Sequence, residues 1–402
     1  MDWYYYIAWA AIVSQLVFLT QMLTNHRHAL IEHKKERTWY RPKTVLIVPC
    51  KGIDSAFEEN IASFFNQDYE NYSLWFVVAE KLDPAYDKLC KLKESLCRTT
   101  KAKDVQILIA GQGQLCSQKI HNLLHCCGKI SDDVEILAFA DSDACVRPDW
   151  LSHIVYPLRK ARNGTSSGYR WFVPARNNMA TLALSAVNAK IAQLLGDTIF
   201  NQAWGGSMAI RLGDFRRLGI EKIWAKTLSD DLSLSRAVKK AGMRVKYVPA
   251  CLVASYEAVS WKELFEFGRR QFLITRISAP ATWLFGLSGC LYSILGLWGG
   301  AAMAVYADMV GSKNPALFVF VPILFLASQL TRAILRQKMA AKLLEKNRYR
   351  MKTAMIADIL FFWVWSILLL FFIISSSFGR TIIWRGIRYK LLSPTETMVI
   401  SR

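Results

Sequence analysis

The sequence predicts an α/β domain with a mainly parallel sheet, joined to transmembrane helices, one of them N-terminal and about three C-terminal. Two observations predict this fold. Short β-branched runs alternate with helical patterns between residues 43 and 255, and long apolar stretches with few or no charges lie on both sides of that region. Strand–helix alternation is typical of parallel βαβ units with helices on both faces of the sheet.

The composition indicates a membrane protein. The formal net charge is +20, yet 53% of the 402 residues are hydrophobic. This combination suits a basic surface that lies against anionic lipid. A nucleic-acid-binding protein is also basic but does not need long apolar spans, so we expect no nucleic-acid partner. The nine cysteines have no framework spacing and indicate reduced thiols in a cytosolic compartment.

Four apolar segments are candidate membrane spans: 3–23, 281–307, 316–330 and 356–376. A span needs about 20 apolar residues, so the third qualifies only with its flanks. The first segment follows an acidic residue, whereas a signal peptide begins with basic residues. A basic stretch follows the segment, which places the N-terminus outside and the next domain in the cytosol. Counting spans puts the C-terminal tail outside, whereas its basic residues favour the inside. A re-entrant or in-plane fourth segment would remove this conflict.

These segments divide the chain into four parts. We expect an N-terminal anchor over residues 1–26, a cytosolic α/β domain over 40–255, an interfacial amphipathic segment over 256–280, and a membrane region with a basic tail over 281–402. The protein is therefore expected to be an integral, multi-pass membrane protein.

Polar residues follow several predicted strands. The strands cover residues 43–50, 72–80, 105–111 and 135–143, with helices over 56–66 and 84–96 between them. Ligands bind at the carboxyl ends of the strands in such sheets. Lys51 and Asp54 follow the first strand, Glu80 ends the second, and Asp141 and Asp143 end the fourth. We expect a ligand site at this edge of the sheet.

The pair Asp141 and Asp143 indicates a cation site. Like charges this close repel, and a divalent ion relieves the repulsion. A strand-end pair of this kind can hold Mg²⁺ or Mn²⁺ between diphosphate oxygens and neutralise charge on a departing nucleoside diphosphate. A solvated turn explains the pair equally well when it is taken alone.

Two further motifs have both a structural and a functional explanation. Asp230 and Asp231 precede a helical pattern over 232–241, so they could cap the helix or supply a general base for an acceptor hydroxyl. Gly205 and Gly206 would let the backbone approach a ligand, with Ser207 as a donor, but a tight turn would also use them. Structural explanations are the better ones for these motifs in isolation.

Two stretches with basic residues complete the set. In FEFGRRQFLITR (265–276), Arg270 and Gln271 could contact a diphosphate and Phe272 could stack nearby, although a basic membrane-surface helix is an equal explanation. In CSQKIHNLLHCC (116–127) the spacing matches no zinc site, while Lys119 and Asn122 share a helical face. The order of all these motifs along the chain is more informative than any one of them.

That order resembles the membrane-bound family 2 glycosyltransferases of GT-A fold, and in particular ceramide glucosyltransferases and related bacterial enzymes that act on lipids. The resemblance extends from about residue 43 to 392. It is carried by the motifs PCKGID, EKLDPA, SQKIHNL, ADSDACVRPDWL, SDDLS, WGGSMAIR and WRGIRYKL.

The resemblance implies roles for the residues already named. It implies a GT-A nucleotide-sugar-binding domain with Asp231 as the catalytic base and a metal held by Asp141 and perhaps Asp143. With the strand-end and helix positions above, the expected donor-binding residues are Lys51, Asp54, Glu80, Lys119, Asn122, Asp141, Arg270 and Gln271. The expected acceptor-side residues are Tyr169, Arg170, Trp171, Gly205, Gly206, Ser207, Asp230 and Phe272.

The chain also departs from the ceramide enzymes. Those enzymes tend to have glycine at the position of Asp143 and aspartate at the position of Glu80. They also tend to have an Arg-Trp pair at the positions of Gln271 and Phe272. These changes leave sugar transfer intact but weaken the case for ceramide as the acceptor.

The expected function is inverting transfer of a hexose, glucose in the first instance, from a UDP-sugar to the hydroxyl of a membrane lipid such as ceramide or diacylglycerol. A processive polysaccharide synthase is the alternative, although four short-looped spans are few for a polymer channel. A transporter with a regulatory domain would need charges in its spans, and Asp358 is the one such residue.

Overall fold

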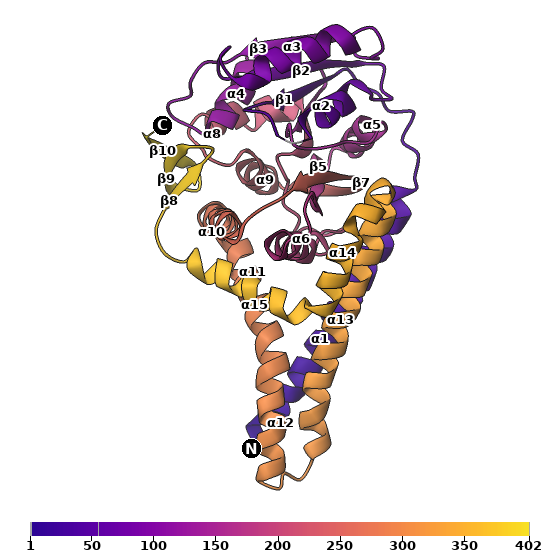
Figure 1. Cartoon of the computed structure of the whole chain (residues 1–402), viewed down its shortest axis with the longest axis vertical. Coiled ribbons are helices and arrows are strands. Elements are labelled where there is room, and N and C mark those ends of the chain that lie inside the picture. Colours follow the sequence, from indigo (N-terminus) through magenta and orange to yellow (C-terminus); the bar gives the residue numbers. More distant parts are fainter. Residues whose placement is uncertain (1, 55, 402) are drawn as a thin grey trace.

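The computed structural model describes residues 2–54 and 56–401 and confirms the predicted α/β domain with membrane-length helices (Figure 1). Seven strands form one sheet in the order β3-β2-β1-β4-β6-β5-β7. The pairings are parallel except for those of β6, which runs antiparallel to β4 and β5. The strands are β1 (Thr44–Pro49), β2 (Tyr72–Val78), β3 (Asp104–Ile109), β4 (Ile136–Ala140), β5 (Asn163–Pro174), β6 (Ser207–Arg211) and β7 (Arg244–Glu257).

Helices cover both faces of this sheet. The central strands β1, β2 and β4 are buried almost throughout, which is why they read as continuous apolar runs rather than as alternating ones. One face packs against α2 (Phe57–Phe65), α3 (Pro84–Leu96) and α5 (Trp150–Val155). The other packs against α4 (Gln118–Cys127), α7 (Leu212–Arg217), α8 (Ile220–Trp224) and α9 (Asp230–Lys240).

Two helices lie between the sheet and the membrane-length helices: α6 (Met179–Ala192) and α10 (Trp261–Ser278) (Figure 1). The start of α10 is fixed by a capping box, in which Ser260 and Glu263 each bond to the other's backbone N–H. Strand β7 runs on to Glu257 beside β5. The first residues of the expected interfacial segment therefore belong to the sheet.

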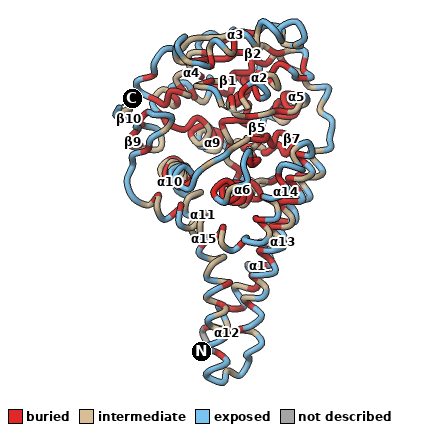
Figure 2. Tube along the Cα trace, in the orientation of Figure 1, coloured by how far each residue is buried: buried red, intermediate tan, exposed pale blue. Residues whose placement is uncertain are grey.

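Three helices form a stalk that projects from the α/β domain, with the N-terminus near its far end (Figure 1). They are α1 (Asp2–His33), α11 (Pro280–Ile294) continuing through a π-helical turn into α12 (Gly300–Met309), and α13 (Pro315–Leu343). All three are long and apolar enough to cross a membrane. Large apolar residues such as Trp9, Val17 and Trp298 are exposed on these helices. In Figure 2 much of the stalk is pale blue, the colour of exposed residues. Exposed apolar surface of this extent suits contact with lipid.

The fourth predicted span is not a straight helix. It is divided between α14 (Arg348–Leu360) and α15 (Phe362–Ser375), which meet at an angle of 87°. Helix α15 lies across the base of the α/β domain (Figure 1). Its exposed residues Trp363, Ile367, Phe371 and Ile374 recur every three or four positions and therefore share one face. Two apolar helices bent in this way form either a broken span or a re-entrant segment.

The charge in that segment has a structural partner. The carboxylate of Asp358 is buried and paired with Arg336 of α13, and Gln337 donates a further hydrogen bond to it. Charged residues within membrane helices usually pair with one another. These partners account for the burial of Asp358.

The C-terminal tail is folded, which the sequence analysis did not predict. Strands β8 (Thr381–Trp384), β9 (Ile387–Ser393) and β10 (Glu396–Ser401) form an antiparallel sheet. Ile382 and Tyr389 pack with Leu273 of α10. The C-terminus therefore lies beside the α/β domain, at the opposite end of the molecule from the N-terminus (Figure 1).

Candidate active site

One cavity of about 640 Å³ lies at the carboxyl ends of β1 and β4, bounded by α4, α6, α9, α10 and the C-terminal sheet. It brings together residues that are far apart in the sequence, including both Asp141 and Asp231. The sequence-predicted residues that line it are Lys51, Lys119, Asn122, Asp141, Asp143, Tyr169, Arg170, Gly205, Asp230, Asp231, Arg270 and Gln271.

Lys119 connects two of the carboxylates. Its Nζ lies 2.7 Å from Oδ1 of Asp141, at the end of β4, and 3.0 Å from Oδ2 of Asp230, at the start of α9. Burial alone would lower the pKa of Lys119, but the charges of Asp141 and Asp230 outweigh it and hold the pKa above its usual value. Burial raises the pKa of Asp230 to about 6, against the opposing effect of Lys119.

The paired glycines are required by close packing against these groups. A Cβ atom on Gly205 would lie 2.4 Å from Oδ2 of Asp230 and 2.7 Å from Nζ of Lys119. A Cβ on Gly206 would lie 2.2 Å from the ring of Trp204 and 2.7 Å from Oδ2 of Asp141. Any side chain here would displace the charged groups, so the glycines allow the backbone to reach the carboxylates.

Asp231 is oriented by three hydrogen bonds. Its Oδ2 accepts from the backbone N–H of Gly205 at 3.1 Å, and its Oδ1 accepts from the hydroxyl of Ser229 and from the N–H of Leu232. Ser229 is also the N-cap of α9. Asp231 is less buried than Asp230 and faces the cavity from the helix N-terminus. A carboxylate fixed in this way is suited to accept a proton from a group in the cavity.

Asp143 has the properties of a cation ligand. Its Oδ1 is buried and has no hydrogen-bond partner among the described residues. Burial, followed by the charge of Asp141, raises the pKa of Asp143. Within residues 2–54 and 56–401, no three His, Cys, Asp or Glu side chains are arranged so that they could hold a metal ion together. The pair Asp141 and Asp143 therefore fits a divalent ion that takes its other ligands from a bound diphosphate.

Three arginines crowd another wall of the cavity. The guanidinium groups of Arg170 and Arg270 lie 5.3 and 5.5 Å from the ring centre of Phe267. Burial, together with the charges of Arg170 and Arg385, lowers the pKa of Arg270 to about 10. Like charges held together in a partly buried cavity favour an anionic ligand.

The C-terminal sheet supplies residues that the sequence analysis did not identify as site residues. The β8–β9 hairpin places Trp384, Arg385 and Tyr389 in the cavity wall. Lys51 Nζ donates to the carbonyl of Arg385 at 2.8 Å, and Arg385 donates to the carbonyl of Lys51 at 2.7 Å. Arg385 and Gly386 both have positive φ, as a two-residue hairpin turn requires. The Arg-Gly pair between alternating residues was the sequence signal for this turn.

Glu257 is another residue that the sequence analysis did not identify. It ends β7 and lines the cavity. Burial and the charge of Asp143 raise the pKa of Glu257 to about 7, although Arg170 opposes the shift. Near neutral pH this carboxyl group is therefore protonated in part, which reduces its repulsion of an anionic ligand.

Several predicted residues do not line the cavity. Ser207 is fully buried and its hydroxyl bonds to Trp150, and Trp171 packs in the core toward α1 and α13, so neither faces the acceptor side. Phe272 packs against the cluster that contains α6 and α15. Gly206 contributes through its close backbone contact with Asp141 rather than as a lining residue.

The expected donor contacts at Glu80 and Asp54 also lie elsewhere. Glu80 is exposed, and Asp54 faces a second cavity while lying 3.7 Å from Arg385. The acidic residue that organises this loop is Asp83, whose Oδ1 accepts from the N–H groups of Gly52 and Ala85. Its place before Pro84 was the available signal, because Asp-Pro is a common start of a helix.

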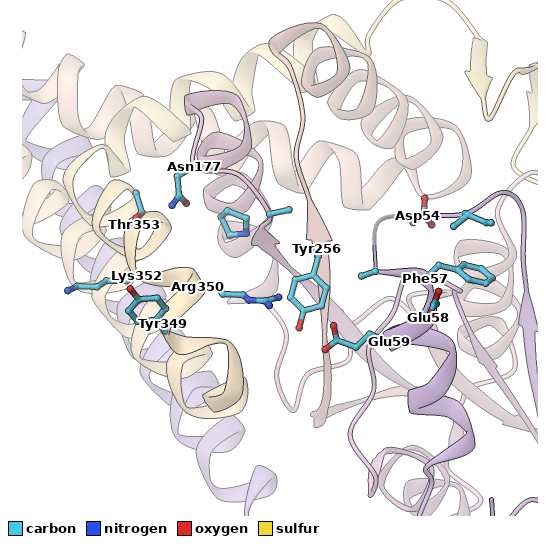
Figure 3. A pocket seen from close by; sticks show the side chains of 14 residues that line it. Asp54, Phe57, Glu58, Glu59, Asn177, Tyr256, Tyr349, Arg350, Lys352 and Thr353 are labelled. Carbon is cyan, nitrogen blue, oxygen red and sulfur yellow. The ribbon is translucent and has the colours of Figure 1, made fainter. Parts of the chain in front are cut away.

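The second cavity, of about 930 Å³, is larger but contains none of the converging aspartates (Figure 3). Its walls carry Glu58 and Glu59 from α2 and Arg350 and Lys352 from α14, with Tyr256 between them. We therefore place the chemistry in the smaller cavity, where Asp141, Lys119 and Asp231 converge.

Comparison with known proteins gives matches over most of the chain. The model of glycosyl transferase family 21 matches residues 6–397. Mannosyltransferase PcManGT from Pyrobaculum calidifontis, solved with GDP-Man and Mn²⁺, is 16% identical, with a TM-score of 0.46, over 92% of this chain and 96% of that one. GalNAc-T7, solved with UDP, GalNAc and Mn²⁺, is 13% identical, with a TM-score of 0.40, over 56% of this chain and 45% of that one.

Proposed function

The chain belongs to glycosyl transferase family 21, and from that premise we propose that it moves glucose from UDP-glucose to the hydroxyl group of a membrane lipid, with inversion at the anomeric carbon. The family assignment confirms the resemblance seen in the sequence and identifies a glycosyltransferase that uses a nucleotide sugar. The identity of the sugar, the identity of the lipid and the roles of individual residues are what we propose.

One observation carries the lipid acceptor: the wall of one cavity combines carboxylates with apolar side chains. Asp141 and Asp231 line it, and so do Leu184 and Ile191 from α6 and Ile274 from α10. Both helices lie between the sheet and the stalk (Figure 1). A lipid could place its hydroxyl among the carboxylates while its chains stay in contact with apolar surface.

Asp231 is the proposed general base. Its hydrogen bonds with Gly205, Ser229 and Leu232 fix the carboxylate, so that it can accept the proton of the acceptor hydroxyl as that oxygen attacks the sugar. Attack from the side opposite the leaving diphosphate gives inversion in a single displacement. Asp230 is held by Lys119 and is therefore less suited to this role.

The leaving group is stabilised by positive charge. Lys119, Arg170 and Arg270 line the cavity and can pair with diphosphate oxygens. Asp141 and Asp143 would hold Mg²⁺ or Mn²⁺, and a divalent ion bound there supplies further charge neutralisation for the departing nucleotide.

The α/β domain is proposed to lie on the cytosolic face. The segment from Arg332 to Lys352, which joins α13 to α14, and the chain after α1 are rich in Lys and Arg, which favours the cytosol for both. The three stalk helices would cross the membrane, and α15 would lie in its surface through Trp363, Ile367 and Phe371. This arrangement puts the folded C-terminal sheet in the cytosol beside the cavity.

A product assay tests the proposal. Membranes that contain the protein, supplied with UDP-[¹⁴C]glucose, are expected to yield an organic-soluble lipid with one glucose per molecule, identified by mass spectrometry. Membranes without the protein, and membranes with the protein supplied with GDP-[¹⁴C]mannose, are the controls. A labelled water-soluble polymer would instead support the processive synthase, and the absence of any labelled lipid would refute the lipid acceptor.

A further inference from the structure

Lys119 occupies the position from which a cation would approach Asp141. The Lys119 ammonium group lies 2.7 Å from Oδ1 of Asp141, in a cavity that both side chains line. The backbone is close as well, since a Cβ atom on Gly205 would lie 2.7 Å from Nζ of Lys119. A divalent ion at Oδ1 of Asp141 therefore has to compete with the Lys119 ammonium group.

Asp143 alone does not make a strong cation site. Its Oδ1 is free of hydrogen-bond partners among the described residues, but it is a single carboxylate. Single carboxylates hold Mg²⁺ or Mn²⁺ weakly, and such ions usually keep waters or take phosphate ligands. Two features therefore oppose metal binding before the nucleotide binds. Lys119 already pairs with one carboxylate oxygen of Asp141, and the positive charge of Lys119 repels the ion.

We propose that Lys119 is an electrostatic latch, which keeps the divalent ion from Asp141 until a nucleoside diphosphate gives Lys119 another partner. This inference rests on the metal site in the proposed function. A diphosphate oxygen offers the ammonium group a negative charge equal to the one it leaves, so Lys119 can turn away from Asp141 at little cost. Metal and nucleotide then bind in a coupled manner.

The latch predicts an unusual gain of metal affinity from the loss of a site residue. In Lys119→Met, Mn²⁺ binding without nucleotide is expected to strengthen at least about tenfold over wild type, since a positive charge a few ångströms from the ion is removed. The full-length protein in nanodiscs is titrated with Mn²⁺ alone and with Mn²⁺ plus UDP, and free Mn²⁺ is measured by electron paramagnetic resonance. Lys129→Met is the matched control, because this exposed lysine follows the same helix outside the cavity.

The outcomes separate the latch from the metal site. Equal Mn²⁺ affinity of wild type and Lys119→Met without UDP would overturn the latch and leave the metal site standing. A wild-type protein that binds UDP but retains no Mn²⁺ in its presence would overturn the metal site in the proposed function. If Lys119→Met lowers the melting temperature, Lys119→Gln replaces it. Glutamine keeps an N–H donor without the charge, so the same gain is expected and its absence counts against the latch.

Discussion

Asp231→Asn is expected to lower kcat by roughly 10²–10⁴-fold, the usual contribution of a positioned general base. Asparagine keeps the shape of the side chain and can still accept from Gly205, but its amide cannot take the proton of the acceptor hydroxyl. Binding of UDP is expected to stay close to wild type, because Asp231 is assigned to the acceptor and not to the diphosphate. The measurement is single-turnover transfer of labelled glucose, with UDP affinity determined by calorimetry on the same sample.

Asp230→Asn is the informative comparison for this prediction. Asp230 precedes Asp231 in the same first turn of α9 but is 4% exposed and bound to Lys119. If Asp231→Asn turns over at a near wild-type rate while Asp230→Asn does not, the base is Asp230 and the assignment to Asp231 fails.

Asp141→Asn is expected to weaken metal-dependent UDP binding by about 100-fold or more, because a bound cation contributes several kcal/mol of charge stabilisation. The substitution removes the negative charge of Asp141, which is proposed to contact the ion and which also pairs with Lys119, whose Nζ lies 2.7 Å away. UDP affinity is measured by calorimetry across a series of Mn²⁺ concentrations. The wild type is expected to show a steep dependence on Mn²⁺, and the variant a nearly flat one.

Asp132→Asn provides the matched control for Asp141. Asp132 lies in the loop before β4, where its side chain is 90% exposed and pairs with Arg216. It should leave the Mn²⁺ dependence unchanged. A steep Mn²⁺ dependence that persists in Asp141→Asn would show that the ion, if bound, is held elsewhere.

The strand-end residues were predictable because the sheet is mainly parallel. β1 and β4 are neighbours with parallel registers, so Lys51 and Asp141 necessarily lie at the same edge. The carboxylate-led helix and the glycine turn could also be located in the sequence. What the sequence could not give was their packing, such as the contact of Gly205 with Asp230.

The residues whose location the sequence did not indicate are explained by strand alternation and by contacts over long sequence distances. Ser207 is the first residue of β6 and points toward Trp150, whereas the neighbouring Gly206 contacts Asp141. The hydrogen bonds of Arg385 with Lys51 join residues 334 positions apart, and no local pattern reports such a contact. Average hydropathy likewise does not reveal the bend at Phe361, which turns one predicted span into two helices.

The central claim is that one cavity holds the nucleotide at its carboxylates and the lipid against its apolar side chains. A cryo-electron microscopy structure of the protein in lipid nanodiscs with UDP and Mn²⁺ tests it most directly. We predict the diphosphate and the ion against Asp141 and Asp143, and a lipid chain between α6 and α10 whose polar end approaches Asp231. Nucleotide bound instead in the second cavity, beside Tyr256 and Arg350 (Figure 3), would contradict the account.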